Sequence, residues 1–295
     1  MASSYLSAVR FFWITRNIDV SFLATSAGIR AAKAGMEKSW YLVNQKREED
    51  SRYLPVSVDM ILDFQQSLST TLSLRQFAGL TAMLFGYSTL SRVSQYLPSA
   101  NDSKYREIHS EDVSFVIMRE GVEVVIPSFK AYDLSLSDIV ECRISRRYTK
   151  TDQTGKGFRY LFPRREIGPN RLFDITTSLW EYVVRVRPIQ GKPFFYLPSE
   201  DWLMTPTFYN AFLKDLAIFH GFDPSRVSSH SLRVGGASAL AAAGLPEYLI
   251  KEMGSWRSNA YLIYLRTCLQ SFSDAQDVLC SAKKFSAQLI RAAFL

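Results

Sequence analysis

The chain has 295 residues, of which 47% are hydrophobic and 21% are charged, close to the averages for a globular protein. Its length allows two ordinary domains, and no stretch of about 18 or more consecutive apolar residues predicts a membrane span. The net charge of +7 permits a nucleic-acid partner but does not by itself require one.

The cysteines and histidines predict neither disulfides nor a metal site. Cys142, Cys268 and Cys280 form no closely spaced pair, and the chain has three histidines. The first residues lead directly into a helical pattern, without the charged segment and cleavage site of a secretion signal. We therefore expect no metal, no cofactor and no export.

The first part of the chain predicts a small helical unit. Apolar residues recur at helical spacing in 4–14, and 29–43 continues as a second, mostly helical piece. The charged stretch 45–52 then leads to Pro55, and a charge-rich, proline-ended segment is typical of a linker. We therefore place a domain boundary near residue 53.

Beyond this boundary the chain predicts helices first. Ser57 opens an expected helix over 58–67, and a longer apolar helix is expected over 74–87. A further helical segment is expected over 92–97.

Short β-branched runs follow and predict two antiparallel hairpins. The expected strands are 112–117, 122–126, 139–145 and 158–162. The first pair is joined by a turn at Gly121 and the second by the polar loop 149–157. From Pro206 onward the pattern is helical almost to the end. Helices, a small antiparallel sheet and more helices predict an α+β domain that is mainly helical.

Positive charge is concentrated between Arg143 and Arg171, where lysines and arginines far outnumber the acids Asp152 and Glu166. This segment includes the polar loop of the second expected hairpin. Such a local positive field suits contacts with phosphate groups, whose strength falls steeply as salt is raised.

The strongest chemical pattern lies in the C-terminal third. His230 and Arg233 stand three residues apart at an expected helix start, hence on one helix face. A helix N-terminus already attracts phosphate, and an imidazole and a guanidinium there make a site for a phosphodiester. Small residues follow that would let another backbone pack closely: Gly235, Gly236, Ala237 and Ala239. The plainer interpretation is that His230 caps the helix and Arg233 forms a surface salt bridge.

The surroundings of this pair carry a family resemblance. The run HSLRVGGASALAAAGLPEYLIKEMGSWRSNAYLIYL resembles the C-terminal signature of tyrosine recombinases, the phage-integrase family. It is most similar to the versions in eukaryotic mobile elements of the DIRS, Ngaro and crypton kinds. The family pattern is HxxR, then a glycine followed by histidine or tryptophan, then a nucleophilic tyrosine. Tyr264, 31 residues beyond Arg233 and ten beyond Gly254, matches that tyrosine.

An upstream arginine also matches the family pattern. The family's first arginine follows an apolar helix and a glycine-containing turn, and Arg92, in the run FGYSTLSRVSQ, occupies that place. The family's acidic residue three positions later is Gln95 here, whose amide can orient an arginine but offers no charge. The alternative for Arg92 is an arginine on a helix surface.

Two further positions match with a departure or a rival. The family's lysine sits on a β-hairpin that enters the DNA minor groove; Lys150, in the run RYTKTDQ, matches it, and Lys156 is the second candidate. Trp256 replaces the more usual second histidine. It lies two residues after Gly254, where one is more usual, so that Ser255 or a shift in register is involved. An indole N–H can donate to a phosphate oxygen, and a purely structural tryptophan is the alternative.

Two tyrosines compete for the role of nucleophile. Tyr261 lies 28 residues beyond Arg233 and three before Tyr264. On a helix both would point to nearly the same face. The family spacing favours Tyr264, with Tyr261 packed beneath it.

The resemblance implies a site-specific DNA recombinase or integrase that cleaves and rejoins double-stranded DNA through a 3′-phosphotyrosyl intermediate. In it Arg92 and Arg233 bind the phosphate, and Lys150 protonates the departing 5′ oxygen. His230 accepts the proton of Tyr264 or binds the phosphate. The energy of the phosphodiester is kept in the covalent bond, so that rejoining needs neither ATP nor a metal.

The resemblance also implies an architecture. Residues 1–53 are part of a helical core-binding domain that clamps DNA, and 54–270 are the catalytic domain. Residues 271–295 form an amphipathic helix that docks on a neighbouring protomer or folds back on its own domain. The family works as a homotetramer on two DNA sites through a Holliday junction. Its place is the nucleus in a eukaryote, and otherwise the cytoplasm or nucleoid.

Two other functions would use nearly the same residues. A type IB topoisomerase-like or telomere-resolving enzyme is the first, and relaxation of supercoiled plasmid without site preference would favour it. A domesticated DNA-binding protein that no longer cuts is the second, because Gln95 and the shifted Trp256 depart from the family pattern.

Overall fold

The computed structural model describes residues 53–68, 71–98, 107–146, 157–168, 173–256 and 261–262. The chain divides into two compact units, Met1–Arg52 and Tyr53–Leu295, and every described residue belongs to the second. The helices expected before residue 53 and the C-terminal helix expected over 271–295 therefore lie outside the described residues. So do Lys150, Lys156 and Tyr264.

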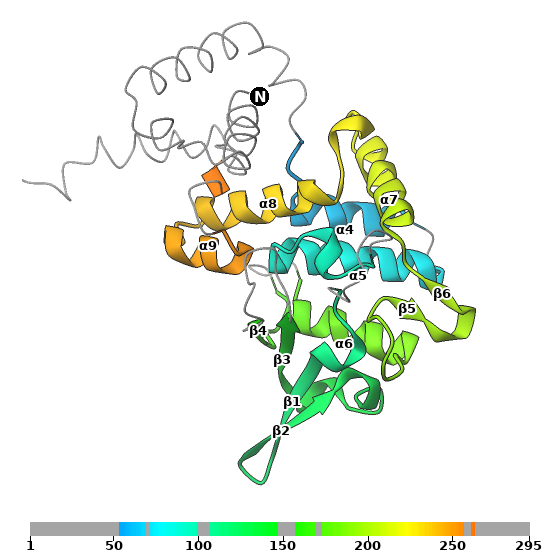
Figure 1. Cartoon of the computed structure of the whole chain (residues 1–295), viewed down its shortest axis with the longest axis vertical. Helices are drawn as coiled ribbons and strands as arrows, with labels where there is room; N and C mark the ends of the chain where they lie inside the picture. Colours follow the sequence, from blue (N-terminus) through cyan, green and yellow to red (C-terminus); the bar gives the residue numbers. More distant parts are fainter. Residues whose placement is uncertain are drawn as a thin grey trace, which may run out of the picture. The chain divides into compact units, whose positions relative to one another are not determined.

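The described unit combines helices with a small antiparallel sheet (Figure 1). Its elements are α4 (Val58–Ser67), α5 (Leu74–Thr89), β1 (Val113–Arg119), β2 (Val122–Pro127), β3 (Ile139–Arg146), β4 (Phe158–Pro163), α6 (Ile175–Val186), β5 (Tyr196–Leu197), β6 (Trp202–Leu203), α7 (Pro206–Phe219), α8 (Ser229–Ala242) and α9 (Glu247–Gly254). The predicted α+β class, mainly helical, is confirmed. Within the described ranges, no helix has the length and apolar character needed to cross a bilayer.

Serine caps set the starts of α4 and α5. The Ser57 hydroxyl accepts the backbone N–H of Met60 at 3.4 Å. At α5 the hydroxyl of Ser73 accepts from the backbone of Gln76 at 3.2 Å, and the Gln76 side chain accepts from the backbone of Ser73 at 3.1 Å. These bonds satisfy N–H groups that a helix start leaves without partners. α4 spans the predicted residues, and α5 runs two residues further than predicted, to Thr89.

The segment after α5 is not the helix that the sequence predicts over 92–97. Leu90 adopts the left-handed conformation with φ of 50°, Arg92 is extended, and only Val93–Gln95 forms a 3₁₀ turn. The side-chain oxygen of Gln95 accepts the backbone N–H of Arg92 at 2.7 Å. The helical prediction is therefore wrong here, because a side chain takes the backbone donor and the chain turns sharply before it.

The four longer strands form one antiparallel sheet in the order β2-β1-β3-β4. β1 and β2 are joined by Glu120 and Gly121, both with positive φ, the geometry of a two-residue hairpin. Both predicted hairpins are confirmed. In β3, Cys142, Ile144 and Arg146 are buried on the inward face, so that an arginine continues the apolar side of the strand.

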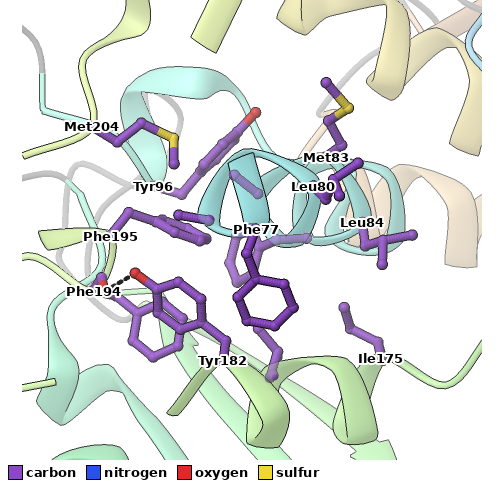
Figure 2. Packing of buried hydrophobic residues seen from close by; sticks show 14 of the residues in the cluster. Phe77, Leu80, Met83, Leu84, Tyr96, Ile175, Tyr182, Phe194, Phe195 and Met204 are labelled. Atoms are coloured by element: carbon purple, nitrogen blue, oxygen red, sulfur yellow. Dashed lines mark hydrogen bonds between the residues drawn. The ribbon is translucent and has the colours of Figure 1, made fainter. Parts of the chain in front are cut away.

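The hydrophobic core lies around α5, which contacts α8 and α6 (Figure 1). Figure 2 shows Phe77 of α5 beside Tyr182 of α6, with Phe194 and Phe195 next to them. The Tyr182 hydroxyl, fully buried, donates to the carbonyl of Phe194 at 3.1 Å, so that its polar end is satisfied. This core fixes α5 and with it the turn that carries Arg92.

Small residues bring other backbones against α8. A Cβ added to Gly235 would lie 1.8 Å from the carbonyl oxygen of Val56, and one added to Gly236 would lie 2.5 Å from the carbonyl oxygen of Tyr87. Val56 also donates its backbone N–H to the carbonyl of Ser231 at 3.1 Å. The predicted close backbone approach is confirmed, and it ties α8 to the end of α5.

Candidate functional site

The start of α8 does not match the plainer interpretation, in which His230 caps the helix and Arg233 forms a surface salt bridge. The cap of this helix is Ser228, whose hydroxyl accepts the backbone N–H of His230 at 3.2 Å. Arg233 is 1% exposed and cannot form a surface salt bridge. Both parts of that interpretation are therefore wrong.

Arg233 joins the C-terminal ends of two helices. Its Nη1 donates to the carbonyl of Leu90, just after α5, and its Nη2 donates to the carbonyl of Gly254, the last residue of α9, at 2.6 Å. Carbonyl oxygens at helix C-termini carry partial negative charge and lack partners within the helix, so that they suit a buried guanidinium. The two bonds fix the plane of the Arg233 guanidinium.

Trp256 covers this guanidinium with its ring. The Arg233 carbon Cζ lies 3.8 Å from the centre of the Trp256 ring, a close cation–π contact. Ser255 has φ of 53°, and the backbone N–H of Trp256 donates to the carbonyl of Lys251 at 2.8 Å. A Cβ added to Gly254 would lie 1.8 Å from the ring. Ser255, the additional residue noticed in the sequence, thus forms a left-handed turn that folds Trp256 over Gly254 onto Arg233.

Arg92 reaches the same region from the turn after α5. It lies two residues beyond Leu90, whose carbonyl accepts from Arg233. Its Nη1 is buried and has no hydrogen-bond partner in the described part of the chain. Gln95, which stands where the family has an acid, accepts the backbone N–H of Arg92 with its side-chain oxygen.

A third arginine lies beside these two. Arg146, at the end of β3, is 2% exposed; its Nη1 donates to the hydroxyl of Tyr160 at 2.7 Å, and its Nη2 donates to the hydroxyl of Ser255. The Tyr160 hydroxyl in turn lies 2.8 Å from the carbonyl oxygens of both Thr89 and Met253, and its one O–H can donate to either. Tyr160 therefore links the ends of α5 and α9, as Arg233 does.

The electrostatics of this group follow from burial and from like charges. Burial, and to a smaller extent the charge of Arg92, lower the pKa of Arg146, while the neighbouring Tyr160 opposes the shift. Burial raises the pKa of Tyr160, and the charges of Arg146 and Arg233 oppose that rise. Neither Arg92 nor Arg146 has a carboxylate within ion-pair distance among the described residues. Guanidinium groups gathered without a carboxylate can bind an oxyanion such as a phosphate.

His230 lies at the edge of this group. It stands one helical turn before Arg233 on α8, and its ring centre lies 5.5 Å from that of Tyr53. Of the predicted site residues, the structure thus brings together Arg92, Arg233 and Trp256, with His230 a turn away.

Tyr261, the rival nucleophile, is packed in a small apolar cluster. It is 4% exposed and its ring centre lies 6.3 Å from that of Trp256. Loss of hydration and the nearby carboxylate of Glu247 raise the pKa of Tyr261, while Lys251 opposes the rise. The reactive phenolate is therefore disfavoured at this position.

The described residues contain no group of three or more His, Cys, Asp or Glu side chains that could hold a metal ion. Arg92, Arg146 and Arg233 supply fixed positive charge and hydrogen-bond donors that can surround an anion.

Comparison with known proteins gives matches among solved structures alone. No protein-family model matches the chain, and no curated protein matches it. The XerH site-specific recombinase, bound to a palindromic difH substrate after cleavage, is similar at 12% identity with a TM-score of 0.49. XerA recombinase is similar at 13% identity with a TM-score of 0.45. The Tn1549 transposon integrase in complex with transposon right end DNA is similar at 13% identity with a TM-score of 0.42.

The similar structures are two recombinases and a transposon integrase. The matches cover 78%, 78% and 77% of this chain in the same order. They cover 54% of the XerH chain, 64% of the XerA chain and 66% of the integrase chain. This chain therefore spans about half to two thirds of the lengths of these proteins.

Two polar residues of the site were not found from the sequence: Arg146 and Tyr160. A signal for the first existed, because Arg146 continues the inward alternation of Cys142 and Ile144 in β3. A charged residue at such a register position is unusual unless it has a partner or a ligand. Tyr160 gave no comparable signal, since its role depends on the ends of α5 and α9 that meet there.

Proposed function

We propose that the protein is a site-specific DNA recombinase or integrase that cleaves and rejoins double-stranded DNA through a 3′-phosphotyrosyl intermediate on Tyr264. One observation carries the proposal. Arg233, buried on α8 and covered by Trp256, is hydrogen-bonded to Leu90, two residues before Arg92. Arg233 is thus bonded to the backbone segment that carries Arg92, which supports the proposal that both arginines bind one phosphate.

The arginines would act on the phosphate in the transition state. Their guanidinium groups donate to the non-bridging oxygens, whose negative charge grows as the tyrosine attacks. The two carbonyl bonds and the Trp256 ring hold Arg233 in place beforehand, so that it need not reorganise during the reaction. A free tyrosine has a pKa of about 10, and positive charge nearby favours its ionised, nucleophilic form.

The covalent step conserves one phosphodiester bond. The Tyr264 oxygen attacks phosphorus, its proton passes to His230 or to water, and the bond from phosphorus to the 5′ oxygen breaks. Lys150 supplies the proton that the 5′ oxygen takes up. Rejoining is the reverse reaction with a 5′ hydroxyl of the partner strand, and it consumes no nucleotide.

The proposal also covers the DNA ligand and the oligomer that would act on it. The XerH structure holds a difH substrate and the integrase structure holds transposon DNA, and we expect a DNA duplex to be the ligand here. The protein would act as a homotetramer that joins two DNA sites through a Holliday junction, within a mobile element and in the nucleus or nucleoid. Residues 1–53 would clamp the DNA, and the helix over 271–295 would dock on the next protomer.

Trapping of the covalent intermediate tests the proposal. Nicked duplexes of randomised sequence lose the strand that could religate, so that cleaved DNA stays on the protein. We expect an SDS-resistant protein–DNA adduct and a released 5′ hydroxyl that polynucleotide kinase labels without prior phosphatase treatment. Tight DNA binding with no adduct would contradict cleavage and leave a DNA-binding derivative. Relaxation of supercoiled plasmid without site preference would favour the topoisomerase alternative.

A further inference from the structure

Arg146 is a buried cation that has no carboxylate within ion-pair distance among the described residues. It occupies an inward position of β3, and its guanidinium carbon lies 5.4 Å from the ring centre of Phe158 and 5.2 Å from that of Tyr160. Its hydrogen-bond partners are hydroxyl groups, of Tyr160 and Ser255, with Ser91 at 3.5 Å. Its Nε is buried and has no hydrogen-bond partner within the described ranges.

The neighbour of Arg146 is another cation. Ser91, which Arg146 contacts, immediately precedes Arg92, and the charge of Arg92 lowers the pKa of Arg146. The Nη1 of Arg92 is also buried and lacks a partner among the described residues. Like charges held together away from water destabilise a fold unless an anion compensates them. An anion bound near Arg92 and Arg146 would therefore stabilise the fold by compensating their two positive charges.

The contacts of Arg146 also reach the second half of the site. Its Nη2 donates to Ser255, the residue whose left-handed turn places Trp256 over Arg233. Arg146 thus contacts both the segment that carries Arg92 and the turn that orients Arg233.

We propose that Arg146 is a positioning residue of the phosphate site: it adds a third positive charge beside Arg92 and braces the Ser255 turn, and a bound phosphate relieves the repulsion between the two arginines. The identity of that phosphate as a DNA phosphodiester rests on the proposed function. Anion binding itself does not.

The first test measures anion-dependent stability of the full chain. Thermal unfolding is followed at constant ionic strength while inorganic phosphate replaces chloride. Arg146→Met removes the charge and keeps an apolar side chain, and Arg159→Met is the control, because Arg159 is exposed on the neighbouring strand β4 and carries the same charge. Both variants experience the general salting-out effect of phosphate equally.

We expect phosphate to raise the Tm of the wild type and of Arg159→Met by the same amount. In Arg146→Met the apparent phosphate affinity should fall by roughly tenfold, because one positive charge beside the anion is lost and the Ser255 turn is no longer braced. In chloride this variant loses an uncompensated buried charge and also the bonds to Tyr160 and Ser255, so that we expect its Tm to lie close to that of the wild type. An equal phosphate-dependent shift in all three proteins would overturn the proposal.

A second variant keeps the test informative if Arg146→Met does not fold. Arg146→Gln keeps amide donors for Tyr160 and Ser255 without the charge, and it should show the same reduced response to phosphate. If neither neutral variant folds even in saturating phosphate, Arg146 is a structural support and the proposal is wrong.

Covalent trapping separates this proposal from the proposed function. If Arg146→Met loses the phosphate response and the wild type forms no adduct, the anion site is supported and DNA cleavage is contradicted. If Arg146→Met forms the adduct at the wild-type rate and its phosphate response is unchanged, the role of Arg146 is contradicted and DNA cleavage is supported.

Discussion

Arg233 and Trp256 form one unit, in which the guanidinium lies 3.8 Å from the centre of the indole ring. The contact depends on the turn at Ser255, because without it the ring could not fold back over Gly254. Trp256 is 8% exposed and belongs to the same small cluster as Leu90 and Tyr261. Its ring therefore orients the arginine and also closes the apolar cluster behind it.

Substitution of Trp256 should separate these two roles. Trp256→Ala removes a buried aromatic ring, and we expect it to lower the free energy of unfolding by about 3–5 kcal/mol. Trp256→Phe keeps a ring face for Arg233 and should cost less, about 1–2 kcal/mol, with adduct formation largely retained. Urea unfolding and the trapping assay measure the two effects. Equal losses in both variants would show that the ring face does not matter.

Gly254 should tolerate no side chain. A Cβ would lie 1.8 Å from the Trp256 ring, so that Gly254→Ala must displace the indole from Arg233. We expect a loss of about 1–3 kcal/mol in the free energy of unfolding, although alanine is intrinsically the better helix former. Gly168→Ala is the matched control, since nothing lies within 4 Å of its added Cβ. A stabilised Gly254→Ala protein would contradict the described packing.

Much of this fold could be predicted from local patterns, and the failures have physical causes. Ser57, the apolar run of 74–87, the β-branched runs and the turn at Gly121 are short-range signals, and they predicted α4, α5 and both hairpins. The prediction of a helix over 92–97 failed because Leu90 takes a left-handed conformation. Its side chain does not favour this conformation, and tertiary contacts impose it. The region that holds α6 and the short β5–β6 pair was not assigned from the sequence.

The candidate site was also predictable only in part, because only some of its residues belong to a local sequence pattern. Motif spacing was enough to select Arg92, Arg233 and Trp256, which the structure brings together. It could not reveal that Tyr160 joins the ends of two helices, or that Arg146 lies against Ser255, because those contacts join β3 and β4 to distant helices. Contacts between elements far apart in sequence leave no local pattern.

Alkaline pH should weaken the fold through its buried tyrosines. Burial raises the pKa of Tyr160 and Tyr182, so that they stay protonated when folded while the unfolded chain ionises near pH 10. Their stabilising contribution is complete below that pH and falls as pH rises above it, by up to about 1.4 kcal/mol per pH unit for each tyrosine. Urea unfolding between pH 8 and about pH 11 measures the slope. Tyr182→Phe should have a shallower slope, and an unchanged slope would contradict this assignment.

Tyr261 should be dispensable for cleavage. Its ring packs against Trp256 and its pKa is raised, so that Tyr261→Phe keeps the packing and removes a hydroxyl that is poorly placed to ionise. We expect this variant to form the covalent adduct within about twofold of the wild-type rate, a change of less than 0.5 kcal/mol in the barrier. Tyr264→Phe should form none. The reverse pattern would make Tyr261 the nucleophile and would require α9 and the residues after it to rearrange on DNA.

The most direct measurement identifies the tyrosine that carries the DNA. The trapped adduct is digested with nuclease and with trypsin, which cuts after Arg257 and Arg266 and releases a peptide that contains both Tyr261 and Tyr264. Fragment ions between the two tyrosines show which one bears the residual nucleotide. We predict the modification on Tyr264 alone. A modification on Tyr261, or a protein that never becomes linked to DNA, would contradict the account.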